Sequence, residues 1–196
     1  MDLHYTAARM GKGRLEAFTD GVVAIIITIM VLELKVPEGI AFSDLEPLLP
    51  VFLSYVLSFI YIGIYWNNHH HMFHAVKHVK GSVLWANLHL LFWLSLTPFT
   101  TGWMGENHFA PTPVAVYGIG LFMSAIAYTI LVRTLIATHG PGSEIAARIG
   151  SDIKGYISLA LYVSAIGLSF FNRTISMVLY FVVAMIWLIP DRRFER

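Results

Sequence analysis

Polar residues stand at the start of a strongly apolar segment near the N-terminus. Arg14, Phe18, Thr19 and Asp20 precede an aliphatic stretch that continues to Leu34. A charged side chain inside a membrane is costly, about 2.5–3.5 kcal/mol for Asp at the centre of a spanning helix and less near its boundary, and it needs a partner. The pattern therefore indicates ion-related chemistry at a helix entrance, or a structural ion pair that satisfies the same requirement.

Spacings of three and four residues place a stripe of side chains on one face of this segment. The stripe consists of Arg14, Phe18, Gly21, Ile25, Thr28, Ile29 and Leu32. An apolar stripe of this kind is usual where helices pack inside a bundle. Thr28 alone does not change that interpretation, because a threonine in a membrane helix commonly bonds to its own backbone. The polar entrance makes a functional role for the stripe the competing hypothesis.

Five histidines lie in the sequence YWNNHHHMFHAVKH, residues 65–78. His70, His74 and His78 recur every four residues, so a helix could present them together to Zn²⁺ or Cu²⁺. The sequence offers no cysteine and no nearby carboxylate, and lysines follow, so we predict no metal here and keep the triad as the alternative. We expect instead hydrogen bonds to other helix ends, with Asp20 bonding an imidazole among His69–His71, or proton sensing near neutral pH.

The composition requires a membrane. Hydrophobic residues make up 57% of the 196 and charged residues 13%, against about 25% in soluble domains. The net charge of +1 argues against a nucleic-acid partner, and the absence of cysteine excludes disulfides and thiolate metal sites. A span needs about 20 apolar residues. We predict an all-α, polytopic membrane protein, a single domain over 1–196, with six helices at about 15–34, 48–76, 83–103, 114–136, 153–171 and 175–189.

Basic residues set the expected orientation, because cytoplasmic loops are enriched in Lys and Arg. Only Lys35 and Arg173 fall on one side of the six spans. The other side carries Arg9, Lys12, Arg14, Lys77, Lys80, Arg133, Arg148, Lys154, Arg192, Arg193 and Arg196. We therefore predict cytoplasmic N- and C-termini and an uncleaved first helix.

The third span contains Asn87 and His89 in its inner half and Pro98 near its outer end, where a bend is expected. The sequence VYGIG, residues 116–120, superficially resembles a carbonyl potassium filter, but it lies within one continuous apolar span, where glycines favour close helix contact. Residues 139–155 are expected to form a plain linker, with a short surface helix as the alternative. Hydrolase motifs are lacking, so we predict no enzyme.

The combination of Arg14 and the following Phe18-Thr19-Asp20-Gly21 resembles the RxxxFSD signature of the transmembrane protein 175 family, endosomal and lysosomal potassium channels with prokaryotic relatives. YWNNHHHMF and NLHLLFWLSLTPF extend the resemblance over about half of the chain. Threonine replaces the serine of the signature.

The resemblance implies a prokaryotic, single-repeat member that assembles as a homotetramer in the cell membrane, with the first helix of each subunit around a central pore. It places the hydrophobic gate at Ile25, further constrictions at Ile29 and Leu32, and the selectivity threonine at Thr28. Arg14, Phe18, Thr19, Asp20, Gly21, His69, His70 and Asn87 would form the supporting network. The function implied is a cation channel with a modest preference for K⁺ over Na⁺, with no cofactor and no small-molecule substrate.

Two other functions compete with this one. A proton- or cation-coupled secondary transporter could use Asp20 and the second-helix histidines as a relay, although no inverted repeat is visible. An enzyme or accessory subunit without conductance would leave the stripe as ordinary core. Unitary currents separate these hypotheses.

Overall fold

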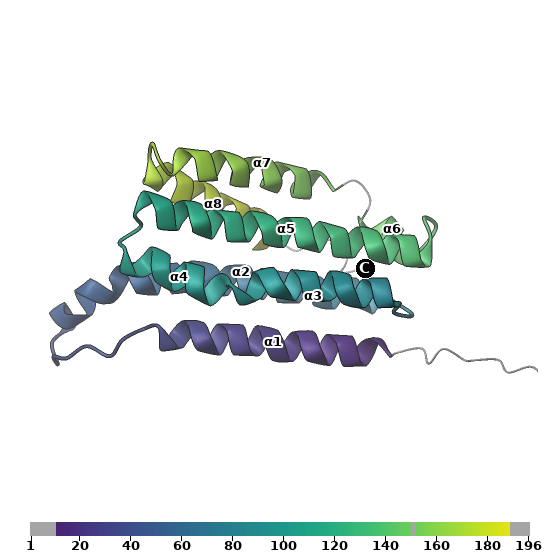
Figure 1. Cartoon of the computed structure of the whole chain (residues 1–196), viewed down its shortest axis with the longest axis horizontal. Helices are drawn as coiled ribbons and strands as arrows, with labels where there is room; N and C mark the ends of the chain where they lie inside the picture. The colour runs from purple at the N-terminus through teal and green to yellow at the C-terminus, as the bar shows by residue number, and fades with distance from the viewer. Residues whose placement is uncertain (1–10, 150–151, 189–196) are drawn as a thin grey trace, which may run out of the picture.

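The structure, a computed structural model, describes residues 11–149 and 152–188, and its regular elements in these ranges are all helical (Figure 1). The helices are α1 Lys12–Leu32, η1 Phe42–Leu48, α2 Leu49–His74, α3 Gly81–Ser95, α4 Thr97–Glu106, α5 Pro111–His139, α6 Glu144–Ile149, α7 Ile153–Leu168 and α8 Arg173–Leu188. The predicted all-α membrane architecture is confirmed.

Successive long helices run in opposite directions and form one bundle. In Figure 1, α1 lies along one edge, where it packs on α2, α3 and α4. On the other side α5 packs against α3, α4 and α7, and α7 and α8 form a hairpin. Helix α1 consequently has neighbours on one side only.

Four stretches of the described chain are long and apolar enough to cross a membrane, namely Lys12–Leu32, Phe42–His74, Gly81–Glu106 and Pro111–His139. Helices α7 and α8 are apolar but shorter, with 16 residues each, and α8 ends where the description ends. The count of six spans therefore stays a prediction. Residue Ile189 of the sixth predicted span lies outside the described residues, as do Arg9, Arg192, Arg193 and Arg196.

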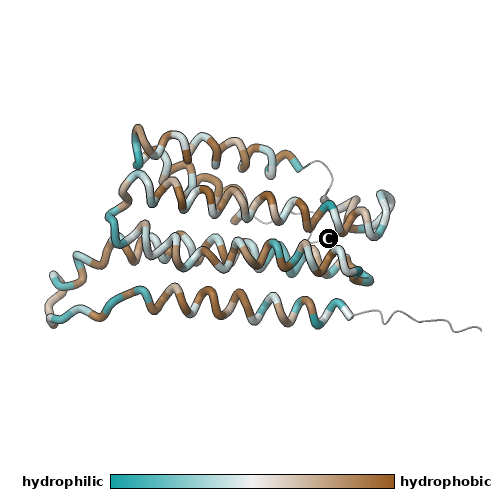
Figure 2. Tube along the Cα trace, viewed as in Figure 1, coloured by the Kyte–Doolittle hydropathy of each residue, from teal (hydrophilic) through white to brown (hydrophobic). Residues whose placement is uncertain are grey.

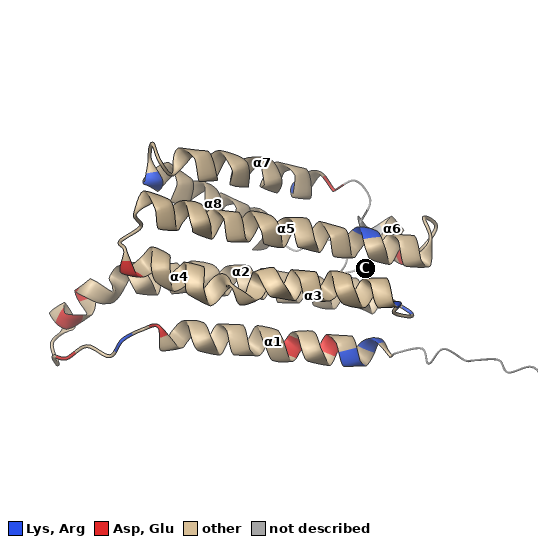
Figure 3. Ribbon diagram, in the orientation of Figure 1, with Lys and Arg blue, Asp and Glu red and all other residues tan. Residues whose placement is uncertain are grey.

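Apolar residues dominate the middle of the long helices, and polar ones gather towards the loops (Figure 2). Most acidic residues cluster at the end where α1 finishes and η1 lies, whereas basic residues gather mainly at the end where α1 and α3 begin (Figure 3). At the acidic end, Lys35 forms a 2.9 Å ion pair with Glu106. This distribution follows the charge asymmetry on which the predicted orientation depends.

The third predicted span is broken where Pro98 stands. Helix α3 ends at Ser95 and α4 begins at Thr97, because Pro98 has no N–H to donate to the carbonyl four residues earlier. The Thr100 hydroxyl donates to the Thr97 carbonyl at 3.2 Å. The expected irregularity at Pro98 thus takes the form of a break between two helices, near the end of the span where Glu106 lies.

The plain linker expected after the fourth span is wrong, and the alternative of a short helix is confirmed. Helix α6 occupies part of it, and Ile145 within α6 is 1% exposed. Burial of this isoleucine stabilises the helix against the bundle.

VYGIG lies within the continuous helix α5, as predicted. A Cβ added at Gly118 would lie closer than contact distance to the Tyr180 ring, so glycine here permits close packing of α5 on α8.

Candidate functional site

Helix α1 has two distinct faces in the single chain. Its buried residues are Leu15, Thr19, Val23, Ile26 and Met30, spaced by three or four, and they face the rest of the bundle. Most of them belong to the larger apolar core, which also contains residues of α2, α3 and α5. Burial of these apolar side chains fixes the rotation of α1 about its own axis.

The predicted stripe occupies the opposite, uncovered face. All seven members, Arg14, Phe18, Gly21, Ile25, Thr28, Ile29 and Leu32, are exposed. The large apolar members are exposed by 55% at Phe18, 57% at Ile25, 43% at Ile29 and 78% at Leu32. A continuous apolar surface of this kind is left for lipid or for other protein chains.

The Thr28 hydroxyl donates a hydrogen bond to the Ile25 carbonyl at 2.9 Å. This local bond satisfies the only hydroxyl hydrogen of Thr28. The lone pairs of its oxygen remain, and Thr28 is exposed, so the side chain can still accept a hydrogen bond or contact a cation outside the helix.

A buried polar chain ties α1 to α2 and α3. The Asn87 side-chain amide donates to the Thr19 hydroxyl oxygen, and its carbonyl oxygen accepts from His69 Nε2, each at 2.9 Å. Because an amide oxygen can only accept, His69 must carry its hydrogen on Nε2. All three residues are at most 3% exposed. The structure thus brings together three residues of the predicted network, one from each helix.

Asp20 has a partner that the sequence interpretation missed. Trp66 Nε1 donates to Asp20 Oδ1 at 2.8 Å, while the buried imidazole of His69 bonds to Asn87. Asp20 was expected to bond an imidazole among His69–His71; His69 bonds Asn87 and His70 bonds His74 instead, because Thr19 turns towards α3 and leaves Asp20 at the exposed edge of α1. Trp66 lies one turn before His70 on the same face of α2, and this spacing could have indicated Trp66 as a partner of Asp20.

Lys12 caps the end of the histidine helix. Its Nζ donates to the Phe73 carbonyl at 3.1 Å, in the last turn of α2. This carbonyl also accepts from the backbone N–H of Val76 at 3.1 Å, and a cation at a helix C-terminus interacts favourably with the helix dipole. Together with the bond from Trp66 to Asp20, it holds the start of α1 against the second half of α2.

The predicted alternative of a triad at His70, His74 and His78 is wrong. Helix α2 ends at His74, so His78 lies in the following loop with its ring 4.6 Å from that of His139 on α5. His70 and His74 do remain neighbours, with 2.9 Å between their Nε2 atoms. Among the described residues, no group of three or more metal-ligating side chains forms.

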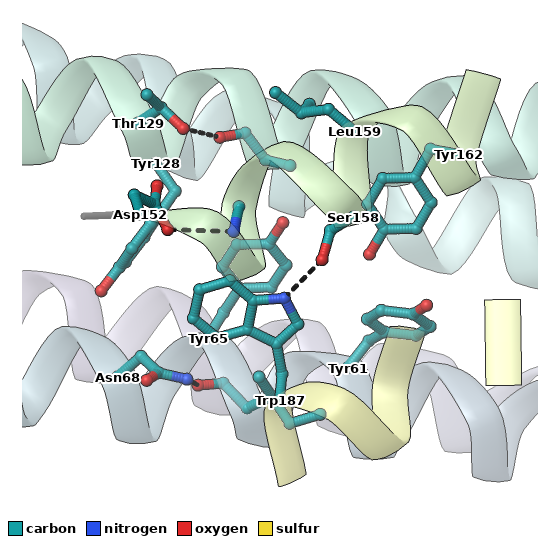
Figure 4. Close-up of a pocket in the computed structure, with 13 residues that line it drawn as sticks. Tyr61, Tyr65, Asn68, Tyr128, Thr129, Asp152, Ser158, Leu159, Tyr162 and Trp187 are labelled. Carbon is teal, nitrogen blue, oxygen red and sulfur yellow. Dashed lines mark hydrogen bonds between the residues drawn. The ribbon is translucent and has the colours of Figure 1, made fainter. Parts of the chain in front are cut away.

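A separate cavity of about 40 Å³ lies between α2, α5, α7 and α8 (Figure 4). Tyr61, Tyr65, Tyr128, Tyr162 and Trp187 give it aromatic walls. The volume suffices for a few water molecules, since each needs about 10–15 Å³. The cavity is not lined by any residue of α1, so it is separate from the stripe and its supporting bonds.

Residues 14–98 match the sequence model of a family described as "Endosomal/lysosomal potassium channel TMEM175". A potassium channel of Chryseobacterium sp. (strain P1-3) is 63% identical over 187 residues, which cover 95% of this chain and 97% of that protein. The chain belongs to the TMEM175 potassium-channel family. The resemblance found in the sequence is thereby confirmed.

A solved member of the family shares the fold. The crystal structure of a lysosomal potassium-selective channel TMEM175 homolog from Chamaesiphon minutus matches with a TM-score of 0.78 and 31% identity, covering 90% of this chain and 96% of that one. The endosomal/lysosomal proton channel TMEM175 of mouse is 27% identical over 188 residues, but this chain spans only 37% of its length. These relatives are ion channels, which confirms the prediction that the chain is not an enzyme.

Proposed function

We propose that this TMEM175-family channel conducts K⁺ in modest preference to Na⁺ through a pore that several copies of α1 line. The carrying observation is the uncovered stripe of α1, on which Ile25, Ile29 and Leu32 stand exposed while the opposite face is buried. Two bacterial relatives, 63% and 30% identical, are named potassium channels, and that name supports the choice of ion.

Aliphatic rings would form the gate. When copies of Ile25 meet around an axis, their side chains narrow the passage and exclude water, which blocks ions without any charged group. When the ring widens, an ion passes after shedding part of its hydration shell. Because K⁺ sheds water at a lower cost than Na⁺, an apolar constriction favours K⁺. Ile29 and Leu32 would repeat the constriction in the following turns.

Thr28 would supply oxygen atoms between these apolar layers. Its hydroxyl hydrogen is directed at the Ile25 carbonyl, so the lone pairs are what the side chain offers outwards. A ring of such oxygens partly replaces the water that a cation loses. The selectivity from this arrangement is weaker than that of a filter built from carbonyl rings.

The polar entrance would serve as the frame of the pore. The bonds from Asn87 to Thr19 and from Trp66 to Asp20 fix the rotation and height of α1 relative to α2 and α3. Arg14, Phe18 and Gly21 lie on the uncovered face beside this frame. A groove of about 250 Å³ next to Arg14 and Phe18, between α1 and α3, adds to the surface open to a neighbouring copy.

A pore lined by one helix per chain needs several chains around one axis. We propose a homotetramer in the cell membrane, with cytoplasmic termini, in contact with lipid and with K⁺ as the permeant ion. No cofactor is required by gating of this kind.

Single-channel recording in planar bilayers tests the proposal through Ile25→Asn. An amide in the gate wets the constriction, so conductance should rise and the preference for K⁺ over Na⁺ should fall. Ile119→Asn is the matched control, because Ile119 on α5 is 43% exposed but does not belong to the stripe. An unchanged reversal potential in Ile25→Asn, an equal change in the control, or coupled flux without discrete openings would each refute the pore assignment.

A further inference from the structure

His70 and His74 stand one turn apart near the end of α2, and both are exposed. Their Nε2 atoms are 2.9 Å apart, and their ring planes are almost perpendicular, at 88° with centroids 4.4 Å apart. A hydrogen bond links the two nitrogens, which therefore lie close enough together to contact one ion at the protein surface.

The distance between the nitrogens allows both to bind one ion. With metal–nitrogen bonds of about 2.0 Å, two ligands of one metal lie about 2.8 Å apart at a right angle and about 3.3 Å apart at a tetrahedral angle. The 2.9 Å between the two Nε2 atoms is the length of their hydrogen bond, and only a small movement of the rings separates it from either arrangement. Square-planar and tetragonal coordination by nitrogen is characteristic of Cu²⁺ and Ni²⁺, and Cu²⁺ is also the strongest binder in the divalent series.

We propose that His70 and His74 form a two-imidazole site for a divalent transition metal of square-planar preference, Cu²⁺ before Ni²⁺, with water in the other positions. Binding replaces the hydrogen bond between the rings. In the metal-free protein one of the two rings carries its hydrogen on Nε2. On binding, this hydrogen is lost from Nε2 and the ring carries one on Nδ1 instead, so that both Nε2 lone pairs are available to the metal. The site needs only two residues, and so it does not depend on His78.

The site is connected to α1 by two contacts. The His70 ring stacks on Trp66, with centroids 5.8 Å apart and planes at 17°, and Trp66 Nε1 donates to Asp20 on α1. A metal that fixes the His70 ring also restrains the stacked indole, and through it the entrance of α1. The consequence for current rests on the proposed function, whereas the binding itself does not.

Calorimetric titration of the full-length, detergent-solubilised protein with Cu²⁺ and with Ni²⁺ tests the binding site. Loss of a group that only supports a metal ligand costs about 10- to 100-fold in affinity, so His70→Ala or His74→Ala should weaken binding by at least about tenfold. The matched control is His108→Ala, since His108 is exposed between α4 and α5 at the far end of the bundle. Unchanged affinity in His74→Ala, or an equal loss in the control, would overturn the proposal.

Two spectroscopic readouts place the metal. The electron paramagnetic resonance spectrum of bound Cu²⁺ should show coupling to two imidazole nitrogens, and to one in His74→Ala. Bound Cu²⁺ should also quench the fluorescence of Trp66, so the quenched fraction should fall in Trp66→Phe. A wild-type spectrum identical to that of His74→Ala would exclude His74 as a ligand.

Current recordings test the link to α1 separately. Cu²⁺ on the cytoplasmic side should reduce the wild-type current and leave His74→Ala unaffected, with His108→Ala responding as wild type. Equal inhibition of wild type and His74→Ala would overturn the link between the metal site and α1. It would not bear on metal binding, which calorimetry tests separately. Absence of any potassium current in the metal-free protein would instead count against the proposed function.

Discussion

Asn87 is the residue whose replacement tests the frame of α1 most directly. It is 2% exposed and makes two interhelical hydrogen bonds, to Thr19 on α1 and to His69 on α2. Asn87→Leu keeps approximately the same side-chain volume but removes both bonds. Thr19 and His69 then remain buried without their partner, which is costly in an apolar surrounding.

The size of the effect follows from interhelical hydrogen bonds in membrane proteins. Such bonds average about 0.6 kcal/mol and reach about 1.7 kcal/mol, so the loss of two corresponds to roughly 1–3 kcal/mol. For a chain of this length, 1 kcal/mol shifts the melting temperature by about 2–4 °C, so Asn87→Leu should lower it by roughly 2–12 °C. Thermal unfolding in detergent, followed by circular dichroism, measures this shift.

A double-mutant cycle separates the shared bond from general damage. Thr19→Val removes only the bond to Asn87, so it should destabilise less, and the double variant should be no less stable than Asn87→Leu alone. Asn107→Leu is the control, because this exposed amide bonds only the backbone of its own helix. Strict additivity in the cycle, or a wild-type melting temperature for Asn87→Leu, would refute the proposed frame.

Three further outcomes are expected. Gly105→Ala should lower the melting temperature, because the added Cβ would lie 2.7 Å from an α2 backbone atom. Gly63→Ala is the control and should not lower it, because nothing lies within 4 Å of a Cβ added there. Equal shifts in the two variants would contradict the packing argument. Thr28→Val keeps the side-chain shape but removes the oxygen, so bi-ionic reversal potentials should show a lower preference for K⁺ over Na⁺, and an unchanged ratio would exclude a role for the hydroxyl. The hydrogen bond and charge of Glu106 raise the pKa of Lys35 above its usual 10.5, so the pair stabilises the fold below pH 10.5 and this stability is lost as the pH rises through the raised pKa. Lys35→Met should therefore lower the melting temperature only at pH values below the raised pKa, and only slightly because the pair is exposed.

Long apolar runs predicted the positions of the long helices, since a span needs about 20 such residues in sequence. The irregularity at Pro98 and the continuity of α5 through VYGIG were also predictable, because a missing N–H and an uninterrupted apolar run act within a few residues. The helix α6 was considered only as an alternative to a linker. It depends on burial of Ile145 in the apolar core, which the sequence does not reveal.

The partners of the polar residues were only partly predictable. Thr19, Asp20, His69 and Asn87 were singled out because polar groups near a membrane need partners. Which group pairs with which depends on the relative rotation of three helices, and a change of one position along a helix turns a side chain by about 100°. That is why Asp20 was matched with histidine although it bonds Trp66. Similarly, the end of α2 at His74 involves a contact from Lys12, distant in sequence, and it removes His78 from the expected triad.

The rotation of α1 links its polar frame to its apolar stripe. At about 100° per residue, the nine positions from Thr19 to Thr28 turn the helix by about 900°, which places Thr28 on the side opposite Thr19. Anchoring Thr19 to Asn87 inside the bundle therefore directs Thr28 outwards, together with Ile25 and Leu32. A hydroxyl at position 19 and an amide at position 87 thus act together with the buried apolar face of α1 to set which side chains α1 presents beyond the single chain, although neither belongs to that surface.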